Sequence, residues 1–210
     1  MDPALDLLLD QLARGQRLGY LGTGDLQAHV EHARAHCGAA RPEPGQRWCD
    51  LGSGGGVPGL VMALDEPDVE FALLDRSERR TEFLRDAVRR LGISDRVRIA
   101  SGDAAQLAHQ PEHRHAYDGV VSRAFGPPGA VAECSSGLVK PGGRLVVSEP
   151  PHLTTRDGLA RWPVDGLAEL GWDFDGLSGG EPTFAVLTRQ PSHLDVYPRA
   201  WKQIRKRPIF

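Results

Sequence analysis

The run of glycines that follows Asp50 constrains this 210-residue chain more than any other feature. It reads DLGSGGGVPG over residues 50–59 and comes directly after residues 46–51, which have the composition of a buried strand. Glycines at the end of a strand let the backbone turn sharply and approach a ligand with no Cβ in the way. Pro58 fits the first position of a following helix. The segment therefore predicts a strand, a ligand-binding loop and a helix in that order.

Strand-like and helix-like segments alternate after this loop. Strands are predicted at residues 70–75, 96–100, 117–122 and 144–149, with one or two more after residue 177. Helices are predicted at residues 57–64, 77–91 and 129–139, and a weaker one at 158–170; Ser77 is the expected cap of the second. Such alternation with short links predicts a doubly wound, mostly parallel α/β sheet. Ligands of such sheets bind in the crevice at the carboxyl ends of the strands.

The chain divides into three predicted regions. Residues 1–40 predict a short N-terminal helical extension, in which Gly15 is the expected end of the first helix. Residues 46–190 form the main α/β domain. Residues 191–210 form a basic tail that packs on this domain or extends from it. The tail region from Gln190 carries a net charge of about +4, although the chain as a whole carries -3.

Composition excludes several classes of protein. Hydrophobic residues make up 40% of the chain and the mean hydropathy is -0.35, so neither a membrane span nor global disorder is expected. The first residues are acidic where a signal peptide needs basic ones, which favours the cytoplasm. Three cysteines without a CxxC motif predict neither a disulfide framework nor a zinc site. His29, His32 and His36 share a helical face, which is interpreted as solvated, and no metal is expected.

Two cofactors fit the glycine loop. Gly54, Gly56 and Gly59 match the dinucleotide pattern GxGxxG, and Asp75 follows at the spacing of a ribose-binding acid. The alternative is the loop of class I methyltransferases, an acid followed by alternating glycines, which binds S-adenosylmethionine (SAM). A lone GxGxxG is weak evidence, so the surrounding acids decide between the two cofactors.

Three acids follow three successive predicted strands: Asp50, Asp75 and Asp103. Asp50 precedes the loop and suits the ammonium group of a methionine moiety, directly or through water. Asp75 suits the two ribose hydroxyls, and Asp103 suits the adenine amino group. This arrangement favours SAM, which carries an ammonium and a sulfonium, over a pyrophosphate-containing cofactor. The competing interpretation is that the acids only cap helices and turns.

Four segments carry a resemblance to a known family. DLGSGGGVPGL, FALLDRSERRTEFLRDAVRRLG, YDGVVSRAF and LVKPGGRLVV, in this order and spacing, resemble the RsmG/GidB family over about residues 46–150. The resemblance implies a Rossmann-like, seven-stranded class I methyltransferase that uses SAM. It also implies methylation of N7 of a guanine in small-subunit (16S) ribosomal RNA. A small-molecule acceptor, such as a nucleobase or a specialised metabolite, is the alternative.

The resemblance and the loop together define the expected cofactor site. Carried over residue by residue, the family pattern implies contacts at Gly52, Val57, Ala104, Ala105 and Arg123. With the glycine loop and the acids, the predicted cofactor-binding residues are Asp50, Gly52, Ser53, Gly54, Gly56, Val57, Asp75, Arg76, Asp103, Ala104, Ala105 and Arg123.

Guanine N7 bears a lone pair and no proton, so the expected reaction needs no general base. Arg123 and Phe125, which follow the fourth predicted strand, are the candidate catalytic residues, through orientation and stacking. The candidate contacts to ribosomal RNA in the small subunit are the cations of the tail, namely Arg199, Lys202, Arg205, Lys206 and Arg207.

The chain also departs from the family pattern. It lacks the family's asparagine-leucine-threonine and histidine-leucine-x-aspartate-serine-leucine motifs in its N-terminal part. Ser148-Glu149-Pro150-Pro151 replaces the lysine-glycine that usually follows the fifth strand, and Ala105 replaces an acid.

Overall fold

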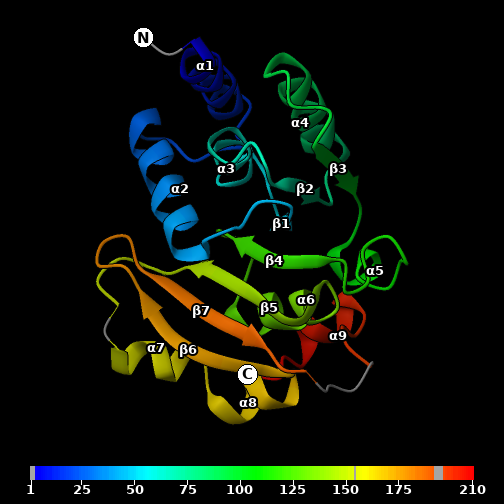
Figure 1. Cartoon of the computed structure of the whole chain (residues 1–210). Helices are drawn as coiled ribbons and strands as arrows, with labels where there is room; N and C mark the ends of the chain where they lie inside the picture. Colours follow the sequence, from blue (N-terminus) through cyan, green and yellow to red (C-terminus); the bar gives the residue numbers. More distant parts are fainter. Residues whose placement is uncertain (1–2, 154, 192–195) are drawn as a thin grey trace.

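Seven strands form one mixed sheet in the computed structural model, which describes residues 3–153, 155–191 and 196–210. Their spatial order is β3-β2-β1-β4-β5-β7-β6 (Figure 1). The first five are parallel, whereas β7 runs antiparallel to both β5 and β6. The predicted doubly wound, mostly parallel fold is therefore confirmed. The strands are β1 (Arg47–Leu51), β2 (Glu70–Asp75), β3 (Val97–Ser101), β4 (Tyr117–Ser122), β5 (Val139–Ser148), β6 (Trp172–Ser178) and β7 (Phe184–Arg189).

Helices cover both faces of this sheet (Figure 1). Those before β4 are α1 (Pro3–Arg17), α2 (Leu26–Ala40), α3 (Gly59–Asp65), α4 (Glu78–Arg90) and α5 (Ala104–Leu107). Those after β4 are α6 (Pro128–Ser136), α7 (Thr155–Arg161), α8 (Val164–Glu169) and α9 (Trp201–Lys206).

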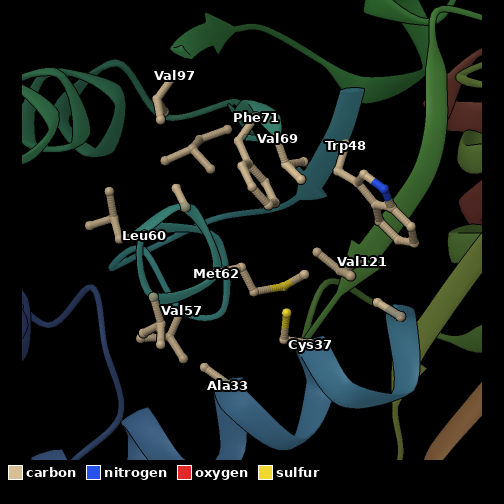
Figure 2. Close-up of a cluster of buried hydrophobic side chains, with 14 of the residues drawn as sticks. Ala33, Cys37, Trp48, Val57, Leu60, Met62, Val69, Phe71, Val97 and Val121 are labelled. Atoms are coloured by element: carbon tan, nitrogen blue, oxygen red, sulfur yellow. The ribbon is translucent and has the colours of Figure 1, made fainter. Parts of the chain in front are cut away.

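The alternation of side chains along each strand gives the sheet two separate cores. On β1, Trp48 faces a core that includes α1 to α4, and Cys49 faces a core that includes α5, α6 and α8. Figure 2 shows Met62 of α3 and Cys37 of α2 in the first core, near Trp48 and Val121 of the strands. The same alternation turns Asp50, two residues after Trp48, toward α3.

The N-terminal helices belong to the first core. Leu8 and Leu12 of α1 and Val30 of α2 are buried in the same cluster as α3 and α4. Gly15 does not end α1, because the helix continues to Arg17. A Cβ on Gly15 would lie 3.3 Å from the ring of Phe83, so this glycine serves close packing between α1 and α4.

Several other boundaries differ from the predictions. Pro58 precedes α3, which begins at Gly59, and β5 begins at Val139 rather than at residue 144. The helix expected at residues 158–170 is two helices, α7 and α8, because Pro163 stands between them and cannot continue the first. The helix expected at 129–139 ends at Ser136, and Val139 already belongs to β5. Within the described part of the chain, no helix is long and apolar enough to cross a membrane.

Candidate active site

A cleft of about 380 Å³ lies at the carboxyl ends of β1 to β4. This is the position that a doubly wound sheet gives its ligands, on either side of the point where strand order reverses between β1 and β4. The residues that line it are Leu51, Gly52, Leu74, Asp75, Arg76, Arg80, Gly102, Asp103, Ala104, Ala124, Phe125, Trp201 and Arg205.

Asp75 ties the end of β2 to the glycine loop. Its Oδ2 accepts a hydrogen bond from the Gly54 amide at 3.0 Å, and its Oδ1 accepts one from the Ser77 amide at 2.9 Å. Arg80 Nη1 lies 3.6 Å from the same carboxylate. Ser77 occupies the N-cap position of α4, as predicted, but its side chain makes no capping hydrogen bond. Asp75 instead holds the residue just before the helix through the Ser77 amide.

Asp103 has a comparable role after β3. Its side chain caps α5 by accepting from the amides of Ala105 at 3.0 Å and Gln106 at 3.3 Å. Asp103 caps a helix and Asp75 accepts from two backbone amides, and both also line the cleft, so a structural role and a ligand-facing position coexist in each side chain.

Asp50 lies beneath the loop and does not line the cleft. Its side chain points toward α3, and its Oδ2 accepts a hydrogen bond from the Gly59 amide at 3.0 Å. Only glycine fits at position 59, because an added Cβ would lie 2.6 Å from that oxygen. Burial raises the pKa of Asp50 to about 7, although the Gly59 bond opposes the shift. The other oxygen, Oδ1, is buried and has no hydrogen-bond partner among the described residues.

Arg123, which directly follows β4, is the cation whose charge lowers the pKa of Asp50. The carboxylate of Asp50 favours the charged guanidinium, while burial is the larger effect and lowers the Arg123 pKa. Arg123 Nη2 contacts His29 Nδ1 at 3.2 Å. Its Nη1 is buried and lacks a hydrogen-bond partner within the described part of the chain. Two oppositely charged groups that influence each other therefore each retain an unpaired polar atom.

A second cavity, also of about 380 Å³, adjoins the cleft. It shares Ala124 and Phe125 with the cleft and is also lined by Arg123, His32 and Arg161. The Phe125 ring lies over Gly52, where a Cβ would approach Cδ2 to 2.7 Å. Phe125 therefore forms the wall between the two spaces.

The histidines of α2 make contacts within the protein. His32 Nε2 lies 2.9 Å from Ser148 Oγ, and His36 Nε2 lies 2.9 Å from the Val146 carbonyl oxygen. Burial lowers the pKa of His32 to about 4 and that of His36 to about 3. They do not form the solvated face expected from the sequence, because this side of α2 packs on the sheet. The described residues contain no group of three or more potential metal ligands.

One cation of the basic tail binds within the protein, and the others lie at the cleft or are exposed. Arg199 donates from Nε and Nη2 to the fully buried Glu133 carboxylate, at 2.8 and 2.7 Å, so it anchors the tail and is not free for a substrate. Arg205 lines the cleft, whereas Lys202, Lys206 and Arg207 are exposed. Residues 192–195 of the predicted tail lie outside the described residues.

The structure brings only part of the predicted cofactor set into the cleft. Gly52, Asp75, Arg76, Asp103 and Ala104 line it. Behind this lining lie Asp50, Ser53, Gly54, Gly56, Val57 and Ala105, whereas Arg123 lines the second cavity. Arg80 and Trp201 were not among the predicted cofactor contacts. The sequence does mark Trp201 as a possible ligand contact, because it is an aromatic residue among cations. Where its side chain points depends on how the tail packs.

The strand order, the glycine loop after β1 and the cleft beside it define a class I methyltransferase fold. A putative O-methyltransferase from Klebsiella pneumoniae has this fold, with a TM-score of 0.60 and 16% identity over 90% of this chain and 91% of that one. Coclaurine N-methyltransferase bound to N-methylheliamine and SAH (S-adenosylhomocysteine) is similar over 62% of this chain and 38% of its own, with a TM-score of 0.52 and 20% identity.

The chain belongs to the GidB family, described as rRNA small subunit methyltransferase G, whose model matches residues 37–150. A relative from Deinococcus deserti, ribosomal RNA small subunit methyltransferase G, is 39% identical over 165 residues, which are 77% of this chain and 67% of that protein. The predicted family is confirmed, and the protein is a methyltransferase.

Proposed function

We propose that this enzyme transfers a methyl group from SAM to N7 of a guanine in 16S ribosomal RNA of the small subunit. The observation that carries the cofactor assignment is the pair of unpaired buried atoms, Asp50 Oδ1 and Arg123 Nη1. The amino-acid half of SAM carries one ammonium and one carboxylate. These two groups would provide the partners that the Asp50 carboxylate and the Arg123 guanidinium lack, with complementary charge.

The cleft suits the adenosyl half. Asp75 and Asp103 line it, and each carboxylate oxygen has lone-pair capacity beyond the amide hydrogen bonds that it already accepts. Ribose hydroxyls and the adenine amino group are donors, so they match these acceptors. The Asp75 and Asp103 contacts are the ones expected from the sequence.

The dinucleotide alternative loses support from the loop's own hydrogen bonds. A pyrophosphate needs free backbone N–H groups at the start of the helix. Here the amides of Gly54 and Gly59 donate to Asp75 and Asp50, respectively. The amides of Gly52 and Ser53 donate to the Leu74 carbonyl, and that of Gly56 donates to the Ser53 carbonyl. These five backbone amides already have acceptors within the protein, so they are not free to bind a pyrophosphate.

Methyl transfer to guanine N7 depends on the positions of the cofactor and the base, and it requires no proton transfer. SAM would supply an electrophilic methyl group: the N7 lone pair would form the new N–C bond as the S–CH3 bond breaks, with S-adenosylhomocysteine as the leaving group. The second cavity offers room for the base next to the cleft, and Phe125 between the two spaces offers a ring for stacking. Arg123 lines this cavity as well, so it would fix the cofactor and limit the position of the base.

The choice of acceptor is supported by the family and by the tail. The relative from Deinococcus deserti is named for action on small-subunit ribosomal RNA. Lys202, Lys206 and Arg207 are exposed cations on and just after α9, near the cleft, where they would contact RNA phosphates. An enzyme with this partner acts in the cytoplasm.

A small-molecule acceptor is the second candidate, because Arg199 pairs with Glu133 within the protein and Arg205 lines the cleft, so neither is free to bind RNA.

Methyl-labelled SAM should be incubated with unmodified small subunits and, separately, with free guanosine. We expect label in 16S ribosomal RNA, recovered as 7-methylguanine. Label in guanosine alone would favour the small-molecule reaction, and label at another RNA atom would contradict the N7 assignment.

A further inference from the structure

The short helix α9 forms one wall of the cleft. Trp201 and Arg205 line the cleft together with Asp103 and Phe125, although they lie about 100 and 80 residues later in the chain. Figure 1 shows α9 beside α6, on the side of the sheet that also carries α5. The sequence suggested an RNA contact for this segment, but two of its side chains face the expected cofactor instead.

Several buried contacts hold α9 in this place. The backbone N–H of Arg199 donates to Glu133 Oε1 at 2.9 Å, in addition to the two guanidinium bonds to this carboxylate. The carbonyl oxygen of Tyr197 accepts a hydrogen bond from Arg114 Nη1 at 2.6 Å. The carbonyl oxygen of Pro198 lies 2.7 Å from His109 Nε2. Ile204, in the middle of α9, is 1% exposed. The wall is therefore anchored to the frame of the domain.

Trp201 is the unusual residue in this wall. Its Nε1 is buried and has no hydrogen-bond partner among the described residues. Trp48, Trp162 and Trp172 each donate from Nε1 to an acceptor within 3.0 Å. Buried indole N–H groups in proteins usually find a partner. The missing acceptor, in a side chain that lines the cleft, points to an acceptor brought by the ligand.

The position of Trp201 indicates which half of the ligand it meets. Its ring packs edge-to-face on Phe125, with 5.6 Å between ring centroids, and it shares the cleft with Asp103. The unpaired atoms of Asp50 and Arg123 lie elsewhere, beneath the loop and next to His29 of α2. The amino-acid half and the Trp201 wall therefore belong to different ends of the site.

We infer that Trp201 and Arg205 are cofactor-binding residues that recognise the adenosyl half of SAM, an inference that rests on the proposed function. The Trp201 indole N–H donates to a ring nitrogen or ribose oxygen of this group. Arg205, exposed at the rim of the cleft, covers the same group with its planar guanidinium. The tail thus contributes Trp201 and Arg205 to the cofactor site, while the neighbouring cations Lys202 and Lys206 stay exposed for RNA.

Calorimetric titration with two ligands tests this inference. S-adenosylhomocysteine contains both halves, whereas 5′-methylthioadenosine contains the adenosyl half and no amino acid. Trp201→Phe keeps an aromatic ring and removes the N–H, and it should weaken both ligands equally, by about 3- to 10-fold. Arg205→Gln should weaken both by about 2- to 5-fold. Gln203→Ala, at an exposed position of the same helix that has no assigned ligand contact, is the matched control and should leave both affinities unchanged.

The outcomes separate the inference from the proposal beneath it. Failure of the wild-type chain to bind S-adenosylhomocysteine contradicts the proposed function and the inference together. Normal wild-type binding, with unchanged affinities in both Trp201→Phe and Arg205→Gln, overturns the inference alone. A loss confined to S-adenosylhomocysteine overturns the assignment to the adenosyl half. Thermal unfolding of each variant verifies that its fold is intact, and Arg205→Gln provides a test at an exposed position.

Discussion

The carboxylate of Asp75 accepts a hydrogen bond from the backbone amide of Gly54, a residue that precedes it by 21 positions. Through this bond, the end of β2 fixes the shape of the loop that follows β1. The second oxygen of Asp75 accepts from the Ser77 amide, so one buried side chain holds the loop and the start of α4 together. A residue expected to bind ribose therefore also builds the site in which the ribose would lie.

Asp75→Asn should destabilise the fold and weaken cofactor binding. An asparagine side chain has one acceptor oxygen, so it cannot accept from both the Gly54 and the Ser77 amides, and one buried donor loses its partner. We expect a loss of about 1–3 kcal/mol in the free energy of unfolding, measured by urea denaturation. Asp65→Asn is the matched control, because Asp65 forms an exposed ion pair with Arg34 and should cost less than about 1 kcal/mol. Equal losses in the two variants would contradict this role of Asp75.

Asp50 should make both stability and cofactor affinity depend on pH. Its pKa is raised from 3.8 to about 7 in the folded protein, mainly by burial, so the folded state holds a proton that the unfolded state releases. Stability from this group is therefore greatest below about pH 4 and falls as pH rises toward 7. An ammonium beside the ionised carboxylate reverses the preference, so ligand binding should expel the proton.

Affinity for S-adenosylhomocysteine should accordingly rise from pH 5.5 to about 7 and then level off. Asp50→Asn cannot ionise, so it should bind more weakly at pH 8 and lose this part of the pH dependence. Calorimetry across this range provides the measurement. A wild-type profile with the same slope as that of Asp50→Asn would show that Asp50 does not face the ammonium.

The sequence was sufficient to predict the strands that build the cleft, because β2 carries a clear apolar run and β1, β2 and β3 end at a glycine or an acid. It also located Asp75 and Asp103 at their tips. It was not sufficient to predict where the Asp50 side chain points. That side chain lies on the same face of β1 as Trp48, under the glycine loop. The orientation depends on which residues of β1 face each side of the packed sheet, and the packed structure is needed to show that.

Other differences arise from tertiary contacts. Gly15 has a low helix propensity, yet α1 continues through it, and the missing side chain lets α1 pack closely against Phe83. In the tail, the sequence shows five cations but not their partners. Arg199 reaches Glu133, which is 66 residues away, and this pairing turns Trp201 and Arg205 toward the cleft. Charge counts cannot distinguish a cation that anchors a segment from one that binds RNA.

The Arg199–Glu133 pair should be essential for stability. The Glu133 side chain is completely buried, so Arg199→Gln leaves a carboxylate with no countercharge. We expect a loss of about 3–5 kcal/mol in the free energy of unfolding. Arg89→Gln, which removes one exposed partner of Asp86, should cost less than about 1 kcal/mol. A loss of similar size for the two arginine variants would contradict the anchoring role of Arg199.

The exposed cations of the tail should carry the salt dependence of RNA binding. Replacing Lys202, Lys206 and Arg207 together by glutamine removes three potential phosphate contacts. The plot of the logarithm of the association constant against the logarithm of salt concentration has a negative slope, and its magnitude should decrease by about 2. Filter binding to unmodified small subunits at several salt concentrations measures this slope. Lys140→Gln, which removes a lysine paired with Asp118, should leave the slope unchanged. An unchanged slope in the triple variant would remove the tail from the RNA interface.

Asp50 and Arg123 are proposed to hold the amino-acid half of the cofactor between them. The most direct test compares the dissociation constants of 5′-methylthioadenosine and S-adenosylhomocysteine for the wild type and Arg123→Gln. The wild type should prefer S-adenosylhomocysteine, and the variant should lose most of this preference, about 10-fold or more, because its carboxylate partner is gone. Affinity for 5′-methylthioadenosine should be unchanged. An equal preference in wild type and variant would show that Arg123 does not bind the carboxylate of the cofactor.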